Sequence, residues 1–292
     1  FNSKLITNKK AFTLICKGVL LFLANNLNLN QSNKKIIMRK YILFFTLLLF
    51  TFSTKINAQA NYKSGEFLKF RIHYSGLNAG FATIEVKDVT LNGKSHFHII
   101  GKGSSSGAVR AFFKVEDLYE SYIDKSDFKP TKFVRNVVEG SYKRHQIYYF
   151  DHANKKAKVE NKRDGTTKTE TIPSDAQELL SAFYSLRNAD QTKLKTGDFL
   201  NENIFLGDET LKFKLKILGR EVLKTKFGKI NAIKIRPYVQ SGRIFKESES
   251  VTMWVSDDDN LVPLKIKAGL LVGSLNADLY EYKNLKSTIK FN

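Results

Sequence analysis

Cysteine, proline and long apolar runs are all scarce in this chain of 292 residues. The single cysteine, Cys16, excludes any disulfide within the chain. Only four prolines occur, and no Pro, Gly or Ser-rich linker divides the sequence, which favours one large domain. Hydrophobic residues make up 42% of the chain and include 23 Phe and 12 Tyr, so a disordered chain is excluded and a sizeable core is available.

The longest apolar run covers residues 41–53, and its 13 residues are fewer than the roughly 20 that span a bilayer. It follows Met38, Arg39 and Lys40 and is followed by small residues up to Ala58, which is typical of a secretory signal peptide. We therefore predict an upstream extension in residues 1–37, a signal peptide in residues 38–58 and a single β domain in residues 59–292. The mature chain would contain no cysteine that could accept a lipid, and we expect it to be periplasmic or secreted.

Most of the chain after residue 64 alternates between apolar and polar residues, as half-buried strands do. Asn92-Gly93 is a strong hairpin signal, because both central positions of a type I′ turn need positive φ. About twelve strands joined by short turns predict a mainly β fold, with one large curved antiparallel sheet that forms a half-barrel. Gly-Glu-Phe-Leu at 65–68 and Gly-Asp-Phe-Leu at 197–200 also hint at an internal repeat.

One convincing helix pattern covers residues 174–190. Ser174 is expected to cap the first amides, with Gln177 as the second half of a capping box. The residues at helical spacing that form an apolar stripe are Ala176, Leu179, Leu180, Phe183 and Leu186. We therefore predict that this helix lies in or across the concavity of the sheet. A packed core and an open cavity both fit the stripe.

Five lysines recur at alternate positions of two predicted neighbouring strands: Lys212, Lys214, Lys216, Lys224 and Lys226. Residues 1–58 hold nine basic residues and no acidic ones, so the mature chain stays basic, with 39 Lys or Arg against 28 Asp or Glu. The lysines fit the solvated side of a hairpin, where they discourage edge aggregation. They also fit attraction to a phosphate-rich membrane surface or an anionic partner. Export argues against nucleic acid, and no stacking aromatics are interleaved with these lysines.

Three motifs could be given a chemical interpretation. Gly-Ser-Ser-Ser-Gly at 103–107 has the letters of a nucleophile elbow, but an elbow needs a parallel sheet and a helix, so we predict a flexible loop. His96 and His98 share a strand face without enough further ligands for a metal, and we interpret them as solvent-facing. Asp-Asp-Asp-Asn at 257–260 fits a hairpin turn better than a calcium loop.

No phosphate-binding or dinucleotide fingerprint occurs. We therefore predict no catalytic residues, no metal and no cofactor, and an enzyme is the least favoured class.

Several stretches match a known family in order and spacing. They are GEFL (65–68), VEDLYESYID (115–124), Arg135 with EGSY (139–142), SAFYSLR (181–187) and WVSDDDN (254–260) with Pro263. Together they resemble the exported domain-of-unknown-function family 3108 over about residues 65–284. The resemblance implies a secreted, largely antiparallel β protein of undetermined activity, and it implies no catalytic residues. The predicted architecture is also similar to the half-barrel lipoprotein carriers of the periplasm, an analogy of fold alone.

We predict an exported, non-enzymatic binding protein that holds an apolar or lipid-like ligand in the half-barrel. The segment 103–113 is predicted to be a lid, because small flexible residues precede two phenylalanines. Permanent burial of these phenylalanines in the core is the competing interpretation. The predicted ligand contacts are Phe112, Phe113, Leu179, Leu180, Phe183 and Leu186. The alternative is a structural or assembly factor that binds another component of the cell envelope.

Overall fold

The computed structural model describes residues 60–292, with gaps at 75, 242–243, 248–250 and 270–272. The predicted upstream extension and signal peptide, residues 1–58, lie outside the described residues. None of the helices in the described part of the chain has the length and hydrophobicity needed to cross a membrane.

The described residues contain fifteen strands, all in one antiparallel sheet. They are β1 (Phe67–Tyr74), β2 (Leu77–Leu91), β3 (Lys94–Ser105), β4 (Val115–Asp124), β5 (Pro130–Glu139), β6 (Tyr142–Asp151), β7 (Lys156–Asn161), β8 (Thr167–Thr171), β9 (Phe199–Phe205), β10 (Thr210–Thr225), β11 (Gly228–Ser241), β12 (Ile244–Glu247), β13 (Val251–Ser256), β14 (Pro263–Gly269) and β15 (Ser274–Lys283). The predicted fold class is confirmed. The strand number exceeds the predicted twelve because short strands such as β9 and β12 carry a weak alternation signal.

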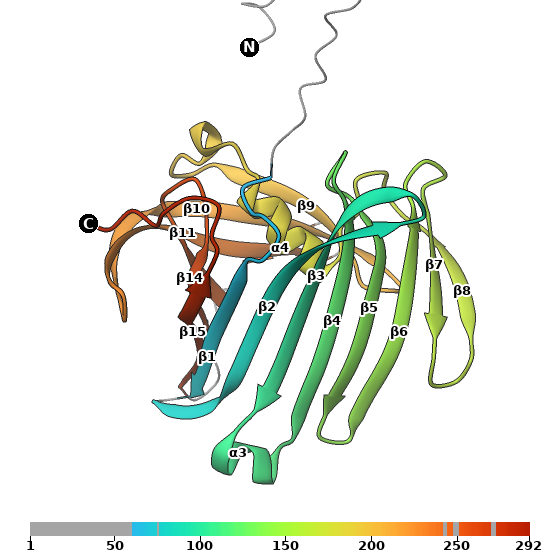
Figure 1. The fold of residues 1–292 in the computed structure, drawn as a ribbon, viewed down its shortest axis with the longest axis horizontal. Helices are drawn as coiled ribbons and strands as arrows, with labels where there is room; N and C mark the ends of the chain where they lie inside the picture. The colour runs from blue at the N-terminus through green and yellow to red at the C-terminus, as the bar shows by residue number, and fades with distance from the viewer. Residues whose placement is uncertain (1–59, 75, 242–243, 248–250, 270–272) are drawn as a thin grey trace, which may run out of the picture. The chain divides into compact units, whose positions relative to one another are not determined.

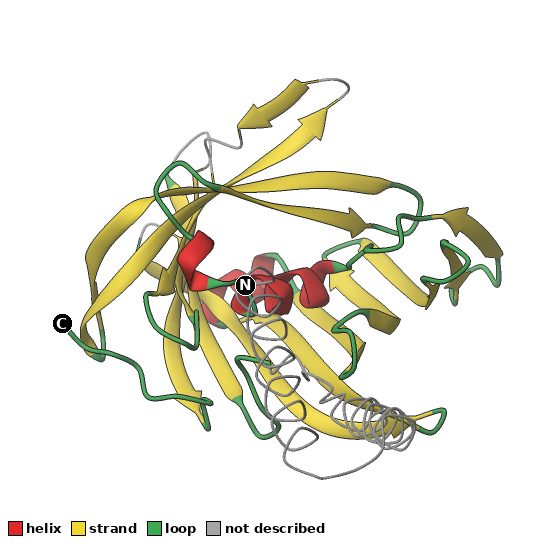
Figure 2. Ribbon diagram, turned by 90° about the horizontal axis from the view of Figure 1, so that it is seen from above, coloured by secondary structure: helices red, strands yellow, loops and turns green. Residues whose placement is uncertain are grey.

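The sheet consists of two meanders joined at the first and last strands. The strand order is β8-β7-β6-β5-β4-β3-β2-β1-β15-β14-β13-β11-β10-β9, and β12 pairs with β11 outside this path. The order leaves β8 and β9 as edges, so the sheet stays open. Figures 1 and 2 show that it curls around one helix, as large twisted sheets do.

The two meanders begin in the same way, which supports the predicted repeat. Gly65 and Gly197 both have positive φ, 84° and 94°, a conformation that favours glycine. The amide of Gly65 donates to the carbonyl of Val86 at 2.8 Å, and the amide of Gly197 donates to the carbonyl of Ile217 at 2.9 Å. Each glycine therefore starts a strand and ties its beginning to the neighbouring strand.

The helices are α3 (Gly107–Phe112), α4 (Leu179–Arg187) and the short 3-10 turn η1 (Gln191–Lys193). Helix α4 is shorter than the predicted 174–190. Gln177 is extended and bridges to β9, because its amide donates to the carbonyl of Asn203 at 2.7 Å and its carbonyl accepts from Phe205 at 2.8 Å. The predicted cap formed by Ser174 and Gln177 is therefore wrong: pairing with the edge strand overrides the helical pattern.

Helix α4 lies in the concavity and contacts three of the four hydrophobic clusters of the described chain (Figures 1 and 2). Leu180 packs against two clusters on β2–β7, and Phe183 packs against one of them. Leu186 belongs to the cluster formed with β10, β11 and β13. The predicted place of the helix, in the concavity, is confirmed.

Candidate functional site

Glu178 caps α4 from a fully buried position. Its carboxylate accepts hydrogen bonds from the amides of Leu180 and Ser181, both at 2.8 Å, and from the Ser121 hydroxyl at 2.5 Å. The Ser181 hydroxyl accepts from the Glu178 amide in return, which completes a capping box one turn later than predicted. Burial raises the pKa of Glu178 to about 7, although these hydrogen bonds act to lower it.

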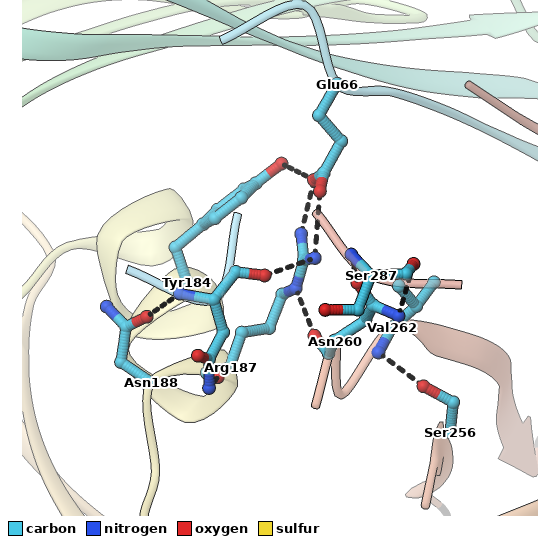
Figure 3. A network of polar contacts seen from close by, with 9 residues as sticks. Glu66, Tyr184, Arg187, Asn188, Ser256, Asn260, Val262 and Ser287 are labelled. Atoms are coloured by element: carbon cyan, nitrogen blue, oxygen red, sulfur yellow. Dashed lines mark hydrogen bonds and ion pairs between the residues drawn. The ribbon is translucent and has the colours of Figure 1, made fainter. Parts of the chain in front are cut away.

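Arg187 ends α4 and is also completely buried. Its guanidinium binds both carboxylate oxygens of Glu66, whose side chain is buried as well, and its Nε donates to the carbonyl of Asn260 at 2.9 Å (Figure 3). The Tyr184 hydroxyl donates to Glu66 at 3.2 Å. Burial acts to lower the pKa of Arg187, but the hydrogen bond and charge of Glu66 outweigh it and raise that pKa. We call Asn61, Glu66, Tyr184, Arg187 and Asn260 the Arg187 cluster.

The Arg187 cluster joins the start of the described chain, the end of α4 and the C-terminal segment. The Asn61 amide donates to the side chain of Asn188 at 2.9 Å, and the Asn260 side chain donates to the carbonyl of Ser287 at 2.9 Å. Asp258 accepts from the Ser256 hydroxyl and the Asn260 amide, at 2.8 and 2.9 Å, so the segment 257–260 forms a hydrogen-bonded turn. In the described residues, no three His, Cys, Asp or Glu side chains gather in a way that could hold a metal ion.

A cavity of about 550 Å³ lies beside the N-terminal half of α4. Strands β2, β3 and β4 supply most of its wall, Leu180 borders it from α4, and Val109 and Phe113 border it from α3 and the residue after it. Leu275 of β15 also lines it. The lining is almost entirely apolar. Its volume is within the range of roughly 300–1,000 Å³ that is usual for ligand sites.

Glycines in the wall leave this space free. Gly101 lies between Ile84 and Tyr119 in neighbouring strands, and Gly103 lies between Ala82 and Asp117. A Cβ atom on Gly101 would come within 3.3 Å of Leu180, whereas one on Gly103 would make ordinary contact with Asp117 at 3.7 Å. Because alternate strand residues share a face, the Gly-Lys-Gly at 101–103 removes two side chains from the same wall.

Two carboxylates lie on the β4 and β5 side of the cavity. Asp117 and Glu139 both line it, and the Asp117 carboxylate accepts from the amide of Val138 at 3.2 Å. Burial raises the pKa of Asp117, and the neighbouring Glu139 raises it further. Burial likewise raises the pKa of Tyr119, which faces Arg135. The site is therefore an apolar pocket with an acidic group on one side.

The structure brings together part of the predicted ligand site. Leu180 and Phe113 both line the cavity, although Phe113 is 51% exposed. Phe112 is 91% exposed, and Leu179 is 42% exposed. Phe183 is half-buried and makes an edge-to-face contact with Tyr184, with 5.6 Å between the ring centroids. Leu186 is in the packed core. The serines of the predicted loop 103–107 instead continue β3 up to Ser105.

The five predicted lysines do not form one continuous face. A register shift between Ile217 and Gly219 places Lys224 on the other side of the β10–β11 ribbon from Lys212, Lys214 and Lys216. Lys216 lies 5.7 Å from the ring of Phe199, and Lys226 lies 3.7 Å from the ring of Tyr280. Aromatic rings from other strands, Phe199 of β9 and Tyr280 of β15, therefore accompany these two lysines, which the linear sequence did not reveal.

The two histidines also differ from the prediction. His96 is buried at 2% exposure, and its Nδ1 lies 2.9 Å from the carbonyl oxygen of Lys94. His98 is half-buried, stacks on Tyr122 with 4.3 Å between ring centroids, and contacts Glu120 at 3.0 Å. The interpretation of both as solvent-facing is therefore wrong, because their strand face is covered by neighbouring side chains.

An open antiparallel sheet that holds a helix and an apolar cavity in its concavity defines a β half-barrel. The chain belongs to the family described as Protein of unknown function (DUF3108), whose model matches residues 69–280. No curated protein matches the sequence.

One solved structure supports the fold. The chain is similar to the crystal structure of a beta-barrel-like protein of domain of unknown function DUF1849 from Brucella abortus, with a TM-score of 0.52 and 9% identity over 76% of this chain and 98% of that one. It also matches a Bacteroides fragilis protein with a YmcC-like fold, with a TM-score of 0.32 and 7% identity over 77% of this chain and 100% of that one. At 9% identity, the likeness to the DUF1849 structure concerns the fold alone.

Proposed function

We propose that this protein is an exported binding protein that holds an apolar, acyl-type ligand in the cavity beside α4. The observation that carries the proposal is the cavity of about 550 Å³ with an almost entirely apolar lining. Water gains few hydrogen bonds in such a space, so an apolar ligand is the favoured occupant.

The glycines of β3 support this proposal. A wall built for packing alone would carry a side chain at position 103, because glycine weakens a strand by roughly 0.5–1 kcal/mol relative to alanine. Gly103 has neither a positive φ nor a close neighbour that would require glycine. Keeping space free for a ligand is a physical reason for its presence.

Export is proposed from the signal-peptide pattern in residues 38–58. Ala60 is buried, and its carbonyl oxygen accepts a hydrogen bond from Lys286 Nζ. These contacts favour cleavage after Ala58, which keeps Ala60 in the mature protein. Intact-mass measurement of the exported chain tests this: a chain that starts at Gln59 is expected, and retention of residues 41–53 would contradict it.

Ligand content tests the binding role directly. Protein purified without detergent is extracted with organic solvent, and the extract is analysed by mass spectrometry. Binding of cis-parinaric acid, a fluorescent fatty acid, to the delipidated protein gives an affinity. We expect about one apolar molecule per chain and saturable binding of the probe.

Gly103→Leu is the sharpest variant, because its side chain would enter the cavity. Ser95→Leu is the matched control, since Ser95 lies on the same strand β3, is exposed and does not line the cavity. Gly103→Leu should weaken probe binding about tenfold or more, which is about 1.4 kcal/mol, and Ser95→Leu should not. Equal binding by the two variants, or an empty wild-type extract, would refute the proposal and favour an assembly factor.

A further inference from the structure

The end of the strands next to the cavity exposes a group of large apolar side chains. They are Leu77, Phe112, Phe113, Tyr142 and Leu275. Phe112 is 91% exposed and Leu77 is 71% exposed, which are the two highest values among the exposed large hydrophobic residues of the described chain. Large side chains exposed together in this way usually mark a surface that binds something.

Backbone pairing and the arrangement of the turns place these residues at one end of the strands. Tyr74 pairs with Leu77 across β1–β2 and with Leu275 across β1–β15. The Gly140 amide donates to the carbonyl of Lys114 at 2.8 Å, and a Cβ on Gly140 would touch the ring of Phe113. Figure 1 shows α3 and the turns β1–β2 and β5–β6 at the same end of the strands. We call this group the apolar rim.

The apolar rim is continuous with the cavity, because Phe113 and Leu275 belong to both. Helix α3 is the most exposed part of the rim, and none of its six residues is buried. Short helices are marginal in water unless they pack against something. Val109 borders the cavity, but the side of α3 that carries Phe112 is exposed to solvent at the mouth of that cavity.

The charge around the apolar rim is positive. Segments 106–116 and 139–144 carry four basic side chains, Arg110, Lys114, Lys143 and Arg144, and two acidic ones, Glu116 and Glu139. Arg110 and Lys114 share the single carboxylate of Glu116, at 2.5 and 2.9 Å. An anionic bilayer has an apolar hydrocarbon interior beneath negatively charged headgroups. Apolar side chains flanked by basic ones match both of these layers.

We propose that the apolar rim docks on an anionic lipid bilayer, with Phe112 inserted among the lipids and the flanking basic residues against the phosphates. This rests on the proposed function, because docking would give an apolar ligand a path between the bilayer and the cavity without crossing water. Phe112 does not line the cavity. Docking and ligand binding can therefore be tested by different substitutions.

Vesicle flotation tests the docking. Full-length mature protein is mixed with vesicles of phosphatidylcholine alone or with added phosphatidylglycerol, and the bound fraction is measured. Phe112→Ser is compared with Phe199→Ser, an identical change at a 44% exposed phenylalanine on the edge strand β9. We expect binding to the anionic vesicles, about a tenfold or greater loss with Phe112→Ser, and little change with Phe199→Ser. Gly103→Leu should bind vesicles like the wild type even though its cavity is filled.

Three results would overturn the docking proposal. The first is a wild-type protein that binds neither kind of vesicle. The second is an equal effect of Phe112→Ser and Phe199→Ser. The third is sedimentation of the wild type as a dimer that Phe112→Ser dissociates, because the rim would then be an interface between two copies. If Gly103→Leu keeps its ligand while Phe112→Ser loses vesicle binding, docking stands and the proposed carrier function fails.

Discussion

The two ends of α4 meet the sheet in opposite ways. At its C-terminal end, the Arg187 cluster fills the space with paired charges and hydrogen bonds, and both Arg187 and Glu66 are fully buried. Beside its N-terminal half, Leu180 faces a cavity whose wall contains glycines. This difference indicates that polar contacts at its two ends position the helix. The side of the helix that carries Leu180 therefore does not have to pack fully against the sheet, and a cavity can remain there.

Removing one partner of the buried ion pair should have the largest effect. Glu66→Ala leaves Arg187 buried without its carboxylate, which typically costs about 3–5 kcal/mol. Denaturant unfolding measures this cost. Glu281→Ala, an exposed carboxylate beside Lys283, is the control and should change stability little. A small effect of Glu66→Ala would mean that α4 is held mainly by its apolar contacts.

Truncations along α4 should separate its packed and open sides. Leu186→Ala should cost about 2–5 kcal/mol, because Leu186 is 3% exposed within a packed cluster. Leu180→Ala should cost clearly less, because that side chain already borders an open cavity. Urea unfolding of the two variants gives the comparison. Equal costs would show that the cavity wall is as tightly packed as the core.

The pH dependence of stability should reveal Glu178. Its pKa is about 7 in the folded protein against an ordinary value of 4.5, so between these values the folded state holds a proton that the unfolded state has lost. Stability contributed by this group is therefore fully present below about pH 4.5 and falls as pH rises to about 7, by roughly 3 kcal/mol. Glu178→Gln should flatten this part of the profile relative to the wild type. Parallel profiles for the two proteins would contradict the shifted pKa.

Side chains added to the two wall glycines should have the smallest effects on stability, and they should differ. Gly103→Leu should change the free energy of unfolding by less than about 1 kcal/mol, because its Cβ meets only ordinary contacts. Gly101→Leu should cost about 1–3 kcal/mol, because its Cβ would press on Leu180. Thermal unfolding distinguishes them, and similar losses would indicate that the cavity collapses in solution.

Much of the fold was predictable from local patterns. The alternation of residues such as Leu68 and Phe70 specifies strands, and Asn92-Gly93 forms the predicted turn between β2 and β3. The errors arose where distant segments intervene. Gln177 leaves the helical pattern because β9 offers it hydrogen bonds, and the bulge before Gly219 reverses the face on which the later lysines lie. Neither contact leaves a signal in the neighbouring sequence.

The candidate site was less predictable than the fold. Leu180 and Phe113 were identified by their apolar character, but the shape of the cavity depends on Gly101 and Gly103, which lack side chains. The Gly-Lys-Gly sequence at 101–103 does indicate that one face of this strand lacks side chains. Nothing in the sequence linked Glu66 to Arg187, because 121 positions separate them and a helix-end arginine has a simpler explanation.

The junction of the two meanders has a consequence for the order of assembly. β1 is the first described strand and β15 the last, yet they are neighbours at the centre of the sheet. Pairing between distant segments is slow, because the closure of a long loop must precede the contacts that stabilise it. During synthesis or export, the halves can each form hairpins, but they cannot join until the final residues arrive. A chain delivered from its N-terminus would therefore stay unfinished until its last strand emerges, which would suit the export proposed above, because an exported chain can cross a membrane unfolded.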